Sequence, residues 1–257
     1  MKIGVGLPVF NGVEFIELAI KSILNQTRLP DKVIIYDDGS TDNTLMFCRE
    51  LMHKFDPQIK KIPIFRFVKV GINRGIGYSR HFLTEQIRQD RDYIAFISAD
   101  DEWEPKFLET MEKSAKDNPN KIIFCETNMV DRDGESMLQS QERTFESQEQ
   151  FVYDCWDAAR KYKMFVNFSG VLMPSSVFEK IQFDVNERIG EDYKFLLESI
   201  SLKKIQYNYV GLPLLRYRCH NKMTTVLKSK EIGANDERMM AEIKKQKLLL
   251  TNKTIEA

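Results

Sequence analysis

The sequence predicts an α/β protein built on a sheet of parallel strands. Through the first half of the 257 residues, short apolar segments alternate with segments whose apolar residues recur at helical spacing. Right-handed crossovers between parallel strands place the strand ends together at one edge of the sheet, where α/β proteins bind ligands. The expected strands are 3–9, 32–37, 64–70 and 93–98, and the expected helices are 13–25, 41–55, 76–88 and 105–116.

The helical segments each show an apolar face that can pack on the sheet. In segment 13–25, residues Phe15, Ile16, Ala19, Ile20, Ile23 and Leu24 share one side. Segment 41–55 shows the same spacing, and Ser40, Thr41 or Asp42 can cap its first turn. These apolar residues are expected in the core rather than in a binding site.

The second half of the chain is less regular. A strand is expected at 121–128, a polar loop at 135–150, a helix containing Trp156 at 153–163, and an extended or looped segment at 167–174. A helix at 193–202 and strands at 205–210 and 214–217 follow, and residues 221–257 are expected to form a helical appendage that packs on the body or on a second subunit of a homodimer.

Composition excludes some classes of function. The 38 basic and 38 acidic residues cancel, so no charge excess favours nucleic-acid binding. The four cysteines have neither disulfide-framework nor metal-site spacing, and no 18-residue apolar stretch or signal peptide is found, so a cytoplasmic protein is expected. The lysine-rich segment 228–253 fits either peripheral contact with the inner face of a membrane or an amphipathic packing helix.

Asp100 and Asp101 follow the apolar strand 93–98 and therefore lie at the carboxyl edge of the sheet. Adjacent carboxylates repel each other unless a cation offsets them, which makes a hard divalent metal a natural partner. The alternative is a plain helix N-cap.

Two further strand ends carry polar residues suited to a nucleotide. Asp38 can accept a hydrogen bond from a base or a ribose hydroxyl, although a capping turn would also explain it. After the third strand, a glycine-containing loop carries Asn73 and leads to Arg80, which can brace a nucleotide or its diphosphate; the alternative places Arg80 on a helix surface. The loop does not have the GxGxxG spacing of dinucleotide-binding proteins, and a P-loop is absent.

Together these motifs resemble those of family 2 glycosyltransferases. The motifs occur in the family's order, and they are Pro8-Val9-Phe10-Asn11, the DDGSTD run from Asp37, Asn73-x-Gly75, Asp100-Asp101 and Glu191-Asp192. The resemblance implies a GT-A fold over residues 1–220, in which a Rossmann-like nucleotide-sugar-binding half (1–101) is fused to an acceptor-binding half (102–220) around a central mixed sheet. It also implies inverting transfer of a sugar from a nucleotide sugar, with UDP favoured.

The same resemblance implies roles for individual residues. Asp101 would hold Mn²⁺ or Mg²⁺, Asp100 would contact the ribose or sugar, and Asp192 would be the general base, with Glu191 as the adjacent candidate. The segment Tyr217-Arg218-Cys219-His220 resembles a family motif in which His220 would add a metal or diphosphate contact and Arg218 could bind phosphate. The residues expected at the nucleotide end are Pro8, Val9, Asn11, Asp38, Asn73 and Arg80.

The resemblance leaves the acceptor open. A glycan, lipid-linked or protein-linked acceptor in polysaccharide or glycoconjugate synthesis is expected. Trp103 and Trp156 are candidates for stacking on a sugar, and a core or rim position is the alternative for Trp103. A Gln-x-x-Arg-Trp element is missing, which favours addition of one sugar per encounter. Two alternatives remain: a protein of the same fold that binds nucleotide sugars without turnover, and nucleotidyl transfer, for which the segment Leu7–Gly12 lacks the required arginine and lysine.

Overall fold

The computed structural model describes residues 1–138, 167–201 and 205–223. The expected helix at 153–163, with Trp156, and the expected appendage beyond residue 223 lie outside these ranges. In the described ranges, no helix is long and apolar enough to span a bilayer.

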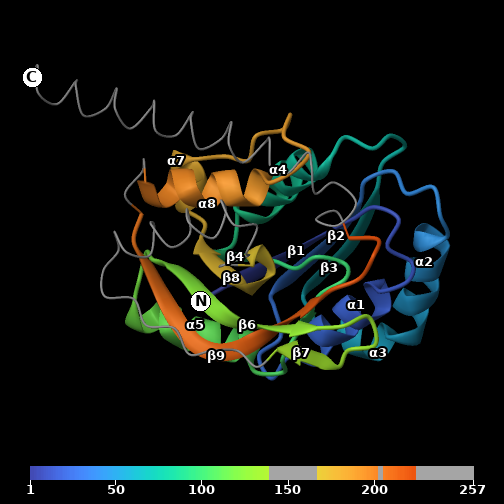
Figure 1. The fold of residues 1–257 in the computed structure, drawn as a ribbon, viewed down its shortest axis with the longest axis horizontal. Coiled ribbons are helices and arrows are strands. Elements are labelled where there is room, and N and C mark those ends of the chain that lie inside the picture. The colour runs from blue at the N-terminus through green and yellow to red at the C-terminus, as the bar shows by residue number, and fades with distance from the viewer. Residues whose placement is uncertain (139–166, 202–204, 224–257) are drawn as a thin grey trace, which may run out of the picture.

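A single mixed sheet runs through the molecule (Figure 1). Its order is β3-β2-β1-β4-β8-β6-β9-β5, and β7 pairs with β6 beside this path. The first four strands are parallel, whereas β8 is antiparallel to both β4 and β6. The strands are β1 (Ile3–Val9), β2 (Lys32–Asp37), β3 (Ile64–Lys69), β4 (Tyr93–Phe96), β5 (Glu102–Trp103), β6 (Ile122–Val130), β7 (Ser136–Leu138), β8 (Val171–Pro174) and β9 (Tyr207–Arg218).

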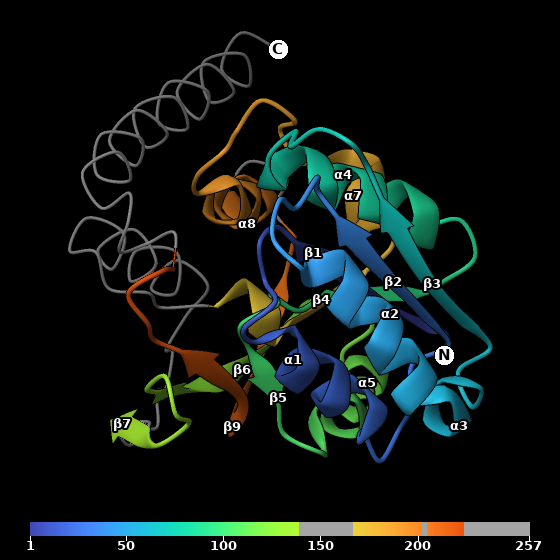
Figure 2. The same ribbon diagram turned by 90° about the vertical axis from the view of Figure 1, so that its right-hand side faces the viewer.

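Helices cover both faces of the sheet, which gives three layers (Figures 1 and 2). One face carries α1 (Ile16–Leu24), α2 (Thr44–Lys54), α3 (Asp56–Ile59) and α5 (Phe107–Asp117). The other face carries α4 (Ile76–Ile87), α7 (Val177–Lys180) and α8 (Glu191–Ser201). The expected α/β fold with a central mixed sheet is therefore confirmed.

Two apolar cores lie on opposite faces of the sheet. Because side chains alternate along a strand, Val33 and Ile35 of β2 enter the core beneath α1 and α2, whereas Ile34 and Tyr36 enter the core beneath α4. Helix α4 packs closely against β1 at Gly4. A Cβ atom at this position would lie 2.1 Å from Cγ2 of Ile87, so the packing requires a glycine. This close packing sets α4 against the strand whose end leads into the site.

The structure differs from the sequence-based expectation in three segments. Glu102 and Trp103, which precede the expected helix at 105–116 and for which no strand was expected, form the short strand β5 against β9. The two strands expected at 205–210 and 214–217 are one strand, β9, with an irregularity in register beside β6. Segment 167–174 consists of a 3₁₀ turn, η1 (Phe168–Gly170), followed by β8. In each case pairing with a distant strand decided the conformation.

Candidate functional site

The loops that follow β1 and β2 are tied together at the carboxyl edge of the sheet. The side-chain oxygen of Asn11 accepts a hydrogen bond from the backbone N–H of Thr41 at 2.8 Å, and the backbone N–H of Asn11 donates to Oγ of Ser40 at 2.9 Å. Pro8 and Val9 are buried at the end of β1, directly before this loop. The expected convergence of these two strand ends is confirmed.

Asp38 holds the loop after β3 in place. Its buried carboxylate accepts hydrogen bonds from the backbone N–H groups of Arg74 at 3.0 Å and Gly75 at 2.8 Å. The loop so held contains Asn73, which is partly exposed. The contacts of Asp38 and Asn73 with a nucleotide remain predictions, and the carboxylate of Asp38 keeps acceptor capacity beyond these two bonds.

Asp101 is almost fully buried, with 1% of its surface exposed. Its Oδ2 accepts a hydrogen bond from Oγ of Ser169 at 2.6 Å, and its Oδ1 accepts one from the backbone N–H of Arg218 at 3.3 Å. Burial raises the pKa of Asp101 well above its usual range, Asp100 raises it further, and the bonds from Ser169 and Arg218 oppose the rise. A neighbouring cation would remove the cost of ionising this acid.

Asp100 is the more exposed member of the pair, and it pairs with His220. Oδ2 of Asp100 lies 3.2 Å from Nε2 of His220. The His220 ring packs on Phe15 at 4.6 Å between centroids, and its Nδ1 accepts from the backbone N–H of Lys222 at 3.2 Å.

Asp101 and His220, the expected metal ligands, thus lie on either side of Asp100, which was expected to contact the ribose or sugar. Carboxylate oxygens suit Mn²⁺ or Mg²⁺, and the adjacent acids would gain from a cation. No cluster of three or more His, Cys, Asp or Glu side chains arranged to hold a metal occurs within the described ranges.

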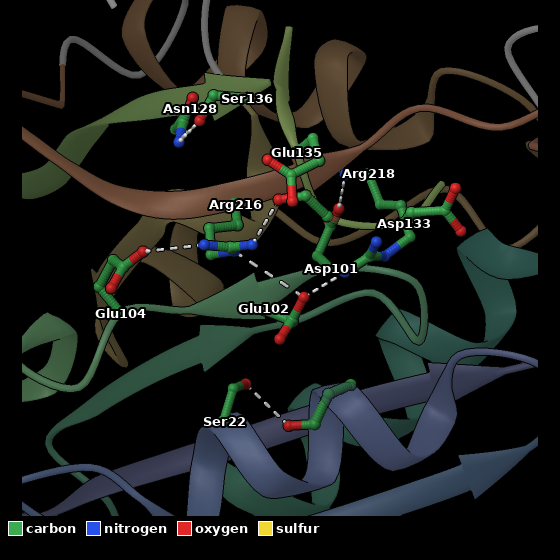
Figure 3. Close-up of polar contacts among 12 residues, drawn as sticks. Ser22, Asp101, Glu102, Glu104, Asn128, Asp133, Glu135, Ser136, Arg216 and Arg218 are labelled. Carbon is green, nitrogen blue, oxygen red and sulfur yellow. Dashed lines mark hydrogen bonds and ion pairs between the residues drawn. The ribbon is translucent and has the colours of Figure 1, made fainter. Parts of the chain in front are cut away.

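The guanidinium of Arg218 is buried beside Glu102 (Figure 3). It forms a salt bridge with Glu102 and donates to the backbone carbonyls of Asp131 at 3.1 Å and Arg132 at 2.7 Å. Arg218 therefore links β9 to β5 and to the turn between β6 and β7. Its expected contact with phosphate stays a prediction.

Arg80 joins α4 to the start of α8. Its guanidinium forms a salt bridge with Glu191, lies 3.0 Å from Oδ2 of Asp192, and stands over the ring of Phe168 at 4.6 Å. The alternative of a helix-surface arginine is wrong, because only 5% of Arg80 is exposed. The contact of Arg80 with the nucleotide end stays a prediction, since its guanidinium is directed to the two acids.

The two acids of this cluster, Glu191 and Asp192, differ in how much of each side chain is exposed. Glu191 is 4% exposed, whereas the side chain of Asp192 is 32% exposed. Burial raises the pKa of Glu191 to about 8, because it outweighs the opposing effect of Arg80 and is reinforced by the charge of Asp192. Burial alone would lower the pKa of Arg80, but Glu191, Asp192 and Asp101 raise it overall. The guanidinium of Arg80 is therefore the cationic partner of both Glu191 and Asp192.

The turn η1 connects the acid pair with the Arg80 cluster, and the sequence did not reveal it. Ser169 contacts Asp101, and the adjacent Phe168 lies under Arg80. Trp103 donates from Nε1 to the backbone oxygen of Ser169 at 2.6 Å and is itself 3% exposed. Of the two positions expected for Trp103, the structure shows the core position, because its ring stacks on that of Phe107 at 4.3 Å between centroids. A lone serine in an apolar segment gives no local signal of such a role.

The chain is similar in sequence to known proteins. The sequence profile described as Glycosyl transferase family 2 matches residues 5–181. An uncharacterized glycosyltransferase of Rickettsia typhi is 23% identical over 222 residues, which cover 85% of this chain and 64% of that protein. The chain thus spans less than two thirds of the length of this relative.

Solved structures with the same fold include glycosyltransferases with bound nucleotides. The S. aureus TarS 1–349 structure in complex with UDP matches with a TM-score of 0.65 and 15% identity, over 95% of this chain and 70% of that one. The mannosyltransferase PcManGT from Pyrobaculum calidifontis, in complex with GDP-Man and Mn²⁺, matches with a TM-score of 0.56 and 16% identity, over 82% and 55% of the two chains. The fold is of the GT-A type, and with the profile spanning most of the described sheet, the chain belongs to glycosyl transferase family 2.

Proposed function

We propose that this chain is the catalytic domain of a glycosyltransferase that moves a sugar from a nucleotide-sugar donor to an acceptor hydroxyl. The observation that carries the proposal is the arrangement of two acidic clusters around η1: Asp100 and Asp101 on one side, and Glu191 and Asp192 on the other. Family membership and the carboxyl-edge position of the first cluster support the same reading. The acceptor class stays open between glycans and lipid-linked or protein-linked glycoconjugates.

The donor is proposed to bind over the ends of β1 to β3, with its diphosphate toward Asp101. UDP is favoured as the nucleotide, and the UDP bound to TarS supports this choice. Asp38 and Asn73 lie on loops that approach each other there. Asp100, whose carboxylate is partly exposed, is free to turn toward a ribose or sugar hydroxyl while it stays near His220.

Asp101 and His220 are proposed to hold a divalent cation, which when bound supplies Lewis-acid stabilisation of the departing diphosphate. The Mn²⁺ in the PcManGT structure supports this choice of ion. Asp101 presents a buried carboxylate with acceptor capacity left on both oxygens, since each accepts a single hydrogen bond. Burial excludes water from this carboxylate, which strengthens its attraction for a cation.

Asp192 is proposed as the general base that takes the acceptor proton. Of the two adjacent acids, only Asp192 has a substantially exposed carboxylate, and Glu191 is enclosed against Arg80. The salt bridge to Arg80 holds the Asp192 carboxylate in place at the start of α8. Attack from the face opposite the diphosphate would invert the anomeric centre.

Donor binding tests this function directly. A panel of UDP-, GDP- and dTDP-sugars with Mn²⁺ should contain at least one compound that raises the melting temperature, because a ligand that binds only the native state stabilises it. The Asp101→Asn variant should lose the Mn²⁺-dependent part of that rise. Turnover is then measured as release of the nucleoside diphosphate. Binding without any turnover across a panel of acceptors would favour the non-catalytic alternative, and no binding at all would contradict the proposal.

A further inference from the structure

Ser169 makes the shorter of the two hydrogen bonds to the carboxylate of Asp101. We propose that Ser169 is a positioning residue, which orients Asp101 so that the free acceptor sites of its carboxylate face a divalent cation. The inference rests on the proposed metal role of Asp101. It adds a residue of η1 to a site otherwise built at the ends of β4 and β9.

The direction of the hydrogen bond follows from the surroundings of the Ser169 hydroxyl. The backbone N–H of Ser98 donates to Oγ of Ser169 at 3.1 Å, which uses an acceptor site of that oxygen. Oγ of Ser98 lies farther away, at 3.2 Å. The single hydroxyl proton of Ser169 is therefore best placed in the 2.6 Å contact with Asp101, which is the shorter of the two.

The backbone of Ser169 is held on both sides, so its side chain cannot move freely. Its N–H donates to the side-chain oxygen of Asn167 at 2.9 Å, and its carbonyl oxygen accepts from Nε1 of Trp103 at 2.6 Å. Ser169 is 1% exposed and Trp103 is 3% exposed. A hydroxyl fixed in this way limits rotation of the carboxylate that it contacts.

Loss of this hydroxyl would release one oxygen of Asp101 without removing the metal ligand itself. Partners that orient a metal ligand are commonly worth about 10- to 100-fold in metal affinity. Ser169→Ala should therefore weaken Mn²⁺ binding by about that factor while the fold is kept. Ser169→Thr, which restores a hydroxyl, should recover most of the affinity.

The test is a titration of the full chain with Mn²⁺, followed by the electron paramagnetic resonance signal of the free ion, with and without UDP. Ser175→Ala is the matched control, because Ser175 also donates its hydroxyl within the same segment, to the backbone oxygen of Arg91 at 2.6 Å, but away from Asp101. Asp101→Asn serves as the reference for loss of the ligand. The expected order of affinity is wild type and Ser175→Ala, then Ser169→Ala, then Asp101→Asn.

The possible outcomes distinguish the positioning role of Ser169 from the metal role of Asp101. If Asp101→Asn loses Mn²⁺ binding and Ser169→Ala keeps wild-type affinity, the positioning role is wrong and the proposed function stands. If Asp101→Asn binds Mn²⁺ as the wild type does, the proposed metal role fails and the inference fails with it. If Ser169→Ala does not fold, Trp103→Phe, which removes one bond to Ser169, must weaken Mn²⁺ binding; wild-type affinity in that variant would overturn the inference.

Discussion

At the scale of single residues, the neighbouring acids Glu191 and Asp192 show how a difference in burial suits similar side chains to different roles. Both contact Arg80, but only Asp192 reaches solvent to a substantial degree. A general base must approach the proton that it accepts, so an enclosed carboxylate is unsuited to the task. Glu191 instead fixes Arg80, and through it the position of Asp192.

This division of roles predicts different kinetic effects for two isosteric substitutions. Asp192→Asn should lower kcat by about 100-fold or more, because a positioned base contributes about that much, and donor binding should change little. Glu191→Gln keeps a hydrogen-bonding group beside Arg80 and should have the smaller effect on kcat. Steady-state rates and donor affinities of both variants check this. Full transfer by Asp192→Asn together with loss in Glu191→Gln would reverse the assignment.

The raised pKa of Glu191 also predicts a pH dependence of stability. In the unfolded chain this carboxyl loses its proton near its ordinary pKa of 4.5, whereas in the folded protein it retains the proton up to about 8. The folded state then binds more protons, so this contribution to stability is complete below 4.5 and is lost as the pH rises through 8. The slope is at most about 1.4 kcal/mol per pH unit.

Glu191→Gln isolates this effect, because the amide resembles the protonated acid and does not titrate. The free energy of unfolding is measured between pH 5 and pH 8 by urea denaturation of both proteins. The wild type should lose stability relative to Glu191→Gln as the pH rises. A difference that is constant over this range would show that Glu191 is already ionised at pH 5.

At the scale of elements, the start of α4 sets the loop that leads into α8. The backbone N–H of Gly77 donates to the carbonyl oxygen of Glu187 at 3.3 Å. A Cβ atom at Gly77 would lie 2.2 Å from the carbonyl oxygen of Asp184 and 2.6 Å from that of Glu187. A glycine is therefore needed where α4, from the nucleotide half, meets the segment that positions Glu191 and Asp192.

Gly77→Ala should consequently destabilise the protein, because two backbone carbonyls must move. A cost of about 1–3 kcal/mol is expected, as for other overpacked sites. Gly71→Ala is the matched control, since no atom lies within 4 Å of a Cβ there, and its effect should stay within about 0.5 kcal/mol. Thermal unfolding of the two variants checks the difference. Equal melting temperatures would mean that the 184–187 loop adapts without cost.

At the scale of the whole molecule, one sheet joins the two expected halves. Strand β4 of the nucleotide half pairs with β8 through Tyr93↔Pro174, Ile94↔Met173 and Ala95↔Leu172. The core beneath α4 contains residues of both halves, including Phe96, Phe168 and Phe195. The expected boundary near residue 101 therefore does not divide the core.

A shared sheet and shared cores predict one cooperative unfolding transition. Far-ultraviolet circular dichroism and tryptophan fluorescence should give the same midpoint in urea, because neither half can keep its core when the other unfolds. Two separated transitions would show that residues 1–101 and 102–220 are independent domains. Coincident transitions would support the expected single domain over residues 1–220.

The sequence alone was enough to predict the parallel strands, their helices and the polar residues at their ends. Strand β1 was predicted over its full extent, and β2 likewise, because buried parallel strands appear as short apolar runs followed by turn residues. The positions of Asp38 and Asp101 at the carboxyl edge of the sheet could be predicted for the same reason, because residues that follow the carboxyl end of a strand lie at that edge.

Only the tertiary structure decided the contacts between distant segments. The strand β5 exists because β9 pairs with it, and no property of Glu102 and Trp103 alone indicates a strand. Arg80 lies against Glu191, 111 positions away in the chain, and Ser169 reaches Asp101 across 68 positions. Local periodicity reports which face of an element is apolar, but the partner of a buried polar group depends on how whole elements pack. The acid pair was therefore visible in the sequence, whereas the serine and the arginine cluster beside it were brought there by the packing of β8 and α8 against the nucleotide half.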